Sequence, residues 1–368
     1  MARPNPPAVL AFLALVMLGA AGCVPQNNPQ GWAGPAVSED GSILVASTDK
    51  GKISALRIAD GFPAEWTFPT GDEDPKIDLE AIYGTPVVRG DNVYFGAYDS
   101  KVYALSLADG RPAWDRPFDT DGPIVAGLAA SDTTLYAASE DGYVYALELA
   151  TGSPVWDRPF DTGAEVWGTP LLAGDRLYVA SVNGKLFALN AATGEEEWDR
   201  PFETGHGLIS DPVLADGTLL VGGIDRELHA VKADSGEKRW PPFKTDNWFW
   251  GRPLVEGGAV YAPNLDGRLY ALSLADGKPV WDAPFEAKEP LRSAPVLAGG
   301  TLVIVDRGGN VYGLKPEDGS KEFGPLELEK TVLADPLLLD GKVIVSAEGG
   351  DLFDIDPVAG RSVRVEAP

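Results

Sequence analysis

The stretch "WDRPFDT" at residues 114–120 recurs unchanged at residues 156–162, as "WDRPFET" at 198–204 and in part as "WDAPF" at 281–285. A glycine precedes each of these tryptophans by four residues, and from Gly110 to Gly360 such glycines follow one another at intervals of 41 or 42 residues. A fixed interval of this length indicates a repeated structural unit. Eight units account for residues 34–368 and leave no room for another domain.

Each unit contains four strand signals separated by turn residues. In the second unit the signals lie at residues 85–89, 92–98, 101–107 and 112–118. Dipeptides such as Asp141-Gly142 between the second and third signals favour tight hairpins. Four antiparallel strands in each of eight units predict an all-β chain that folds as an eight-bladed β-propeller. A solenoid is the alternative, but the sequence contains no capping repeat.

The repeat also has a residue pattern, A-L-x-x-x-x-G-x-x-x-W, which begins at Ala104 and again at Ala146. This pattern resembles that of the PQQ-binding-like β-propeller repeat family. In that family the tryptophan docks between neighbouring blades. The resemblance therefore implies a structural docking role for Trp66, Trp114, Trp156, Trp198, Trp240 and Trp281. As an outer strand, residues 112–118 would place Trp114, Arg116 and Phe118 on one face.

The N-terminus indicates export. Residues 1–22 contain Arg3, an apolar run and small residues before Cys23, as in a secretory signal. Cys23 is the only cysteine and follows "AAG", which resembles a bacterial lipoprotein signal whose cysteine carries the lipid. An ordinary cleaved signal and an uncleaved anchor are the alternatives. We expect residues 23–33 to form a tether and the protein to be anchored in the cell envelope through lipidated Cys23.

Charge and composition limit the chemistry. The formal net charge of −25 repels phosphate backbones, so no nucleic-acid partner is expected. A single cysteine excludes an internal disulfide and a cysteine zinc site. We expect no catalytic residues, cofactor or metal. His206, Ser210 and Asp211 hold the elements of a triad but are too close in sequence to adopt its geometry easily. His229 occupies a position that is aromatic in other units. The acids Asp72, Asp74, Asp78 and Glu80 fit no recognised calcium loop.

The links that join the fourth strand of one unit to the first strand of the next vary in length and content, as binding loops do. We call the face that carries them the loop face and the opposite face the turn face. Three positions before the proline that opens the first strand are Trp32, Tyr83, Trp167 and Trp250. With Trp248, and with Asp211 and Arg252 directly before that proline, they are the candidate partner-binding residues. Packing between blades is the alternative role for the aromatic residues.

Three classes of function are open. The signal, the cysteine and the eight units resemble lipid-anchored propellers that support the assembly of outer-membrane proteins, which implies a monomeric scaffold with an envelope protein as partner. A surface ligand-binding or sensor module is the second class. The third is a PQQ-dependent quinoprotein dehydrogenase. In those enzymes the quinone stacks on a disulfide between adjacent cysteines, which this chain cannot form.

Overall fold

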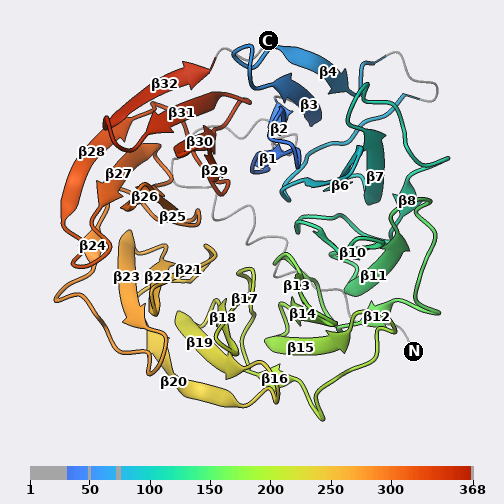
Figure 1. The fold of residues 1–368 in the computed structure, drawn as a ribbon. Helices are drawn as coiled ribbons and strands as arrows, with labels where there is room; N and C mark the ends of the chain where they lie inside the picture. The colour runs from blue at the N-terminus through green and yellow to red at the C-terminus, as the bar shows by residue number, and fades with distance from the viewer. Residues whose placement is uncertain (1–30, 49–50, 72–75, 366–368) are drawn as a thin grey trace, which may run out of the picture.

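The computed structural model describes residues 31–48, 51–71 and 76–365. Within these ranges the chain forms eight four-stranded antiparallel sheets, arranged around a common axis as the blades of a propeller (Figure 1). The strands of each blade are consecutive in sequence and run in order from the centre to the rim. The predicted all-β, eight-bladed propeller is confirmed. The described residues contain no helix long and apolar enough to cross a membrane.

The strands of the first four blades are β1 (Ala36–Val37), β2 (Ile43–Thr48), β3 (Lys52–Arg57) and β4 (Ala64–Phe68); β5 (Val87–Arg89), β6 (Asn92–Ala97), β7 (Lys101–Ser106) and β8 (Phe118–Asp119); β9 (Ala129–Ala130), β10 (Thr134–Ala138), β11 (Tyr143–Glu148) and β12 (Phe160–Asp161); and β13 (Leu171–Ala173), β14 (Arg176–Ala180), β15 (Lys185–Asn190) and β16 (Phe202–Glu203).

The strands of the last four blades are β17 (Val213–Ala215), β18 (Thr218–Gly222), β19 (Glu227–Lys232) and β20 (Lys238–Lys244); β21 (Leu254–Glu256), β22 (Ala259–Pro263), β23 (Arg268–Ser273) and β24 (Phe285–Glu286); β25 (Val296–Ala298), β26 (Thr301–Val305), β27 (Asn310–Leu314) and β28 (Lys321–Glu327); and β29 (Leu337–Leu339), β30 (Lys342–Ser346), β31 (Leu352–Asp356) and β32 (Arg361–Val365).

The hydrophobic core lies between the blades. Each blade buries both faces of its sheet against its two neighbours, so the middle strands are buried almost without interruption, as in β18. Between the second and third blades, for example, Tyr94 and Trp114 pack against Leu135 and Leu147. Because every blade depends on its neighbours for burial, the ring is one structural unit.

A buried tryptophan near the outer edge of each of the first six blades contacts the next blade. Trp156 is typical, because only 5% of its surface is exposed and its Nε1 donates a hydrogen bond to Ala191 O at 3.0 Å. Its indole lies against Gly194, where a Cβ atom would come within 2.7 Å of Cδ2. Gly194 also has a φ of +75°, which favours glycine. The same arrangement recurs at Trp66, Trp114, Trp198, Trp240 and Trp281.

The outer strand is shorter than the sequence predicts in the four blades that carry "WDRPF" or "WDAPF". In the second blade β8 covers only Phe118–Asp119. The segment before β8 pairs with β7 through a single isolated bridge between Pro112 and Leu105. The predicted alternation is wrong here, because Asp115 and Arg116 are both exposed. Ala113 N still donates to Ala104 O of β7 at 2.8 Å, so the chain leaves the ladder only from Trp114 to Pro117, and Pro117 has no N–H to donate. β12, β16 and β24 are equally short.

The eighth blade meets the first without sharing a sheet. Arg364 occupies the tryptophan position of the eighth blade, but it forms an ion pair with Asp351, and its side chain is largely exposed. Among the described residues, no atom beyond the chain neighbours lies within 4 Å of a Cβ placed on Gly61, the turn glycine of the first blade. Phe62, which follows that glycine, packs against the joint instead. The buried core of this joint is Leu44, Ala46, Leu56, Ile344, Leu352 and Val365.

Candidate functional site

Aromatic side chains from distant blades meet on the loop face. Trp167 precedes the fourth blade and Trp250 the sixth, yet their rings stack with centroids 6.1 Å apart and an interplanar angle of 27°. Since a whole blade separates them along the ring, this contact must lie near the axis. Trp32 and Tyr83, which precede the first and second blades, form a second pair with centroids 4.2 Å apart. Tyr98 extends this pair outward at 5.5 Å from Tyr83.

Arg292 joins the two aromatic pairs. Its Cζ lies 4.1 Å from the centroid of Trp32 and 4.4 Å from that of Trp250, so two indoles flank one guanidinium. Its Nε is buried without a hydrogen-bond partner, and no carboxylate of the described residues forms an ion pair with it. Burial lowers the pKa of Arg292 to about 9, and the charge of Asp335 partly opposes this shift. We call Trp32, Tyr83, Trp167, Trp250 and Arg292 the central cluster.

Arg292 was missed by sequence reasoning, although a signal for it existed. It stands three positions before Pro295, the same repeat position as the four aromatic candidates. A pattern restricted to aromatic residues at that position does not include it. The guanidinium provides a positive charge at the centre of a face in a chain with a net charge of −25.

Acidic groups lie beside one side of the central cluster. Burial and the charge of Glu165 raise the pKa of Glu140 to about 7, and the indole of Trp167 partly opposes the rise. The Nε1 of Trp167 is buried and makes no hydrogen bond of ordinary distance and angle, although it lies close enough to Glu140 to influence that carboxyl. Burial also raises the pKa of Tyr83. This part of the loop face therefore holds polar groups whose hydrogen bonding is incomplete.

Asp211 and Arg252 take part in a second set of contacts, apart from those of the central cluster. Oδ1 of Asp211 accepts a hydrogen bond from the backbone N–H of Thr169 in the preceding link, at 2.7 Å. Asp335 accepts an equivalent bond from Ala294 N at 2.7 Å, and its other oxygen lies 3.6 Å from Nε of Arg252. Burial and the charge of Asp335 raise the pKa of Asp211 to about 6. The two hydrogen bonds tie neighbouring links together, and the contact between Arg252 and Asp335 joins the links that precede the sixth and eighth blades.

The remaining candidates of the loop face are placed as follows. Trp248 is half-buried in the same link as Trp250, and its carbonyl oxygen accepts a hydrogen bond from Leu265 N at 3.1 Å. Cys23 and the expected signal lie outside the described residues. Residues 31–33, which the sequence assigns to the tether, are part of the packed body, and Ala33 is fully buried.

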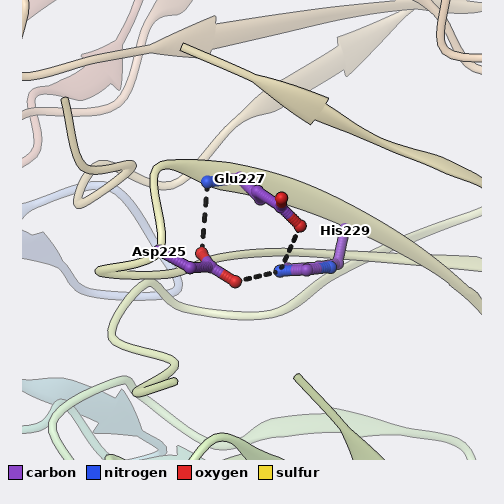
Figure 2. A group of neighbouring side chains, drawn as sticks. All are labelled: Asp225, Glu227 and His229. Carbon is purple, nitrogen blue, oxygen red and sulfur yellow. Dashed lines mark hydrogen bonds and ion pairs between the residues drawn. The ribbon is translucent and has the colours of Figure 1, made fainter. Parts of the chain in front are cut away.

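Three possible metal ligands gather on the hairpin between β18 and β19 (Figure 2). His229 Nε2 lies 2.8 Å from Asp225 Oδ2 and 3.9 Å from Glu227 Oε2, while Lys244 Nζ contacts the other oxygen of Glu227 at 2.6 Å. His229 Nδ1 is buried without a partner. A metal-bound imidazole usually donates its second N–H to an acceptor, so this geometry does not favour a metal site.

The same hairpin position in other blades explains this group. Tyr103, Tyr145 and Tyr270 each donate a hydroxyl hydrogen bond, at 2.6–2.8 Å, to the aspartate four residues earlier. Asp225 is the equivalent aspartate, and its Oδ1 also accepts a bond from Glu227 N at 3.1 Å. His229 thus replaces a tyrosine in a repeated structural contact.

The other chemical candidates do not converge. His206 is exposed, whereas Ser210 is buried and its Oγ accepts a hydrogen bond from Gly222 N at 2.7 Å. Asp78 and Glu80 are exposed, and Asp78 accepts a bond from Glu80 N at 3.0 Å, while Asp72 and Asp74 lie outside the described residues. The residues required to stack PQQ do not fit either, because the chain has no pair of adjacent cysteines.

Comparison with known proteins gives one family along almost the whole chain. A family model described as "Outer membrane protein assembly factor BamB" matches residues 26–158, 98–205, 140–284, 198–323 and 266–363. Similar curated proteins include the outer membrane protein assembly factor BamB of Alkalilimnicola ehrlichii, 30% identical over 116 residues, which are 31% of this chain and 28% of that protein. That of Xanthomonas campestris pv. campestris is 32% identical over 100 residues, or 26% and 24%. The alignments thus span less than a third of either relative.

Solved structures give the same architecture. BamB from Moraxella catarrhalis superposes with a TM-score of 0.70 at 17% identity, over 89% of this chain and 94% of that chain. The computationally designed Ika8 protein superposes with a TM-score of 0.72 at 14% identity, over 88% and 95%. At these identities the similarity establishes the fold alone.

Proposed function

The chain belongs to the family described as outer membrane protein assembly factor BamB, and from this premise we propose that it is a scaffold for outer-membrane protein assembly. In this proposal residues 1–22 are removed on export and a lipid on Cys23 anchors the protein to a membrane of the cell envelope. The propeller acts as a monomer and catalyses no reaction. Its loop face binds another envelope protein.

The central cluster is the observation that carries this proposal. Arg292 is flanked by Trp32 and Trp250 at 4.1 and 4.4 Å and has no carboxylate partner in the described chain. Tryptophan and arginine are enriched among residues that dominate protein interfaces. A guanidinium fixed between two rings loses little side-chain entropy on binding, and an acidic group of a partner would satisfy its charge.

The non-catalytic part of the proposal rests on side-chain chemistry. Two of the three residues that could form a triad are engaged in structural hydrogen bonds. A carboxylate oxygen of Asp211 accepts a hydrogen bond from the backbone N–H of Thr169, and the hydroxyl oxygen of Ser210 accepts one from Gly222 N. The quinoprotein alternative calls for adjacent cysteines that are missing from the sequence. The net charge of −25 supports a protein partner over a nucleic acid.

The test is capture of the assembly machinery by the lipidated protein. Native membranes are crosslinked and solubilised, and the captured proteins are identified by mass spectrometry. We expect Arg292→Gln to reduce capture of outer-membrane assembly proteins strongly, because it removes the unpaired charge. Arg116→Gln removes an exposed charge at the rim of the second blade and should capture as much as the unmodified protein. Thermal melts of both variants show whether the ring is intact.

Two outcomes would count against the proposal. Full capture by a folded Arg292→Gln would exclude the central cluster as the binding site. A protein that captures no assembly protein but retains a small molecule on the loop face would favour the ligand-binding alternative. In that case the buried Trp167 Nε1 and Arg292 Nε are the polar groups to examine first.

A further inference from the structure

The first described residues lie at the centre of the loop face. Trp32 is part of the central cluster, and Ala33 N donates a hydrogen bond to Ile82 O at 3.2 Å. Gly31 packs against the same residue so closely that a Cβ atom would come within 2.1 Å of Ile82 O. From here the chain enters β1, which runs from the loop face towards the turn face. The residues before Gly31 therefore join the propeller on the loop face, near its axis.

We infer that the anchored propeller turns its loop face towards the membrane that holds its lipid. The inference rests on the proposed lipidation of Cys23, which lies eight residues before Gly31. Eight residues of fully extended chain span at most about 29 Å. The centre of the loop face is therefore held within about 29 Å of the lipid headgroups.

The opposite orientation needs a longer chain. To present the turn face to the membrane, the tether would first cross the loop face from the centre to the rim. Four strands of a blade are separated by three spacings, or about 14 Å. It would then pass along the height of the rim, where a six-residue strand such as β6 measures about 20 Å. The two distances together are about 34 Å, beyond the reach of the eight residues.

A shorter path along the axis is blocked by side chains. The central cluster closes the axis on the loop face, and Trp32 itself is one of its members. Asp211 and the paired Arg252 and Asp335 come from links around the same axis and make further contacts between links. A tether threaded through the ring would have to displace Trp32 from both Tyr83 and Arg292.

This orientation narrows the kind of partner that the loop face can bind. The space between the face and the headgroups is at most about 29 Å, close to the diameter of a small domain. A protein that contacts the central cluster must therefore present a membrane-proximal domain, as an envelope protein embedded in that membrane does. A partner with its binding domain far from the membrane would not reach the face.

The orientation can be measured with labels at matched positions on the two faces. Because Cys23 is the only cysteine, an introduced cysteine gives a single reactive thiol in the lipidated protein. On one side of the ring, Asp246→Cys labels the loop face and Lys278→Cys the turn face, at side chains exposed by 86% and 78%. On the other side, Asp121→Cys and the 83% exposed Arg111→Cys form a second pair, which controls for tilt.

The lipidated proteins are placed in liposomes whose headgroups carry a quencher. Both loop-face labels should be quenched roughly twofold more than their turn-face counterparts, since the faces differ in height by about 20 Å. Insertion of a long Gly/Ser segment before Gly31 should abolish the difference. Equal quenching on both faces, stronger quenching on the turn face, or a difference that survives the insertion would overturn the inference.

Lipidation of Cys23, on which the inference rests, is measured separately. The mass of the N-terminal peptide of the mature protein reports the lipid on Cys23, and an unlipidated Cys23 would also overturn the inference. Partner capture is a different measurement, so a correctly oriented propeller that captures no assembly protein would contradict the proposed scaffold function and leave the orientation standing.

Discussion

Replacement of Gly194 by alanine isolates the contact that joins the third blade to the fourth. The new Cβ would lie 2.7 Å from Cδ2 of Trp156, so the indole or the turn must move. Overpacking of this kind costs about 1–3 kcal/mol. The φ of +75° adds about 1–2 kcal/mol for a residue with a side chain. We therefore expect Gly194→Ala to lower the free energy of unfolding by about 2–5 kcal/mol.

Gly174 provides the matched control. Its φ is +63°, but among the described residues no atom beyond its chain neighbours lies within 4 Å of a Cβ placed there. Gly174→Ala therefore carries only the backbone cost of about 1–2 kcal/mol. A second control is Gly194→Ala in a Trp156→Ala background. Without the indole the alanine has room, and its cost should fall to the backbone part. The two substitutions should therefore be non-additive by about 1–3 kcal/mol.

The assay is unfolding in guanidinium chloride followed by circular dichroism, which does not depend on the tryptophan that is removed. Stability differences are taken from the transition midpoints of variants with equal slopes. If Gly194→Ala and Gly174→Ala shift the midpoint equally, the indole contact contributes nothing. Additive effects of Gly194→Ala and Trp156→Ala would refute the same reasoning independently.

Three further predictions concern single side chains. Trp156→Ala should lower the free energy of unfolding by about 3–5 kcal/mol through lost packing. The carbonyl oxygen of Ala191 keeps a hydrogen bond in this variant, because Tyr136 also donates to it at 3.0 Å. An unchanged denaturation midpoint would contradict the docking role of Trp156. Glu140 has a pKa raised from 4.5 to about 7 by burial, so its contribution to stability is present below pH 4.5 and is lost as the pH rises through 7. Melting temperatures across this range should fall more for the unmodified protein than for Glu140→Gln, and the reverse trend would count against a buried carboxyl. His229→Tyr should restore the hydrogen bond found in other blades and leave the melt unchanged or raised. A chelator that lowers the melting temperature of the unmodified protein but not of His229→Tyr would instead indicate a bound metal.

The ring could be predicted from the sequence because its information is local and repeated. The interval between glycines, the four strand signals and the turn dipeptides all lie within one unit. The tryptophan and the glycine four residues before it mark the same turn in every unit that carries them. Blade-to-blade contact then follows from closing similar units into a ring.

The outer strands and the central cluster could not be predicted in the same way. Whether "WDRPF" pairs cannot be predicted from its alternation or from its prolines alone. β16 is as short as β8 although Glu196 stands where the second blade has Pro112, and β20 pairs on both sides of two consecutive prolines. The contacts of Arg292 join links that precede the first, sixth and seventh blades. They depend on how eight units converge at the axis, and no sequence interval encodes that convergence.

The closed ring of complete blades has a consequence for its connectivity. The strands of every sheet are consecutive, and no sheet of the described chain is shared between its two ends. The chain could therefore begin at any link between blades without dividing a sheet. A circular permutant that starts at Pro212 and joins the eighth blade to the first would keep every sheet intact. Moving the lipidation signal to such a start would place the anchor above a different blade, and so would rotate the propeller about its own axis relative to any protein embedded beside it.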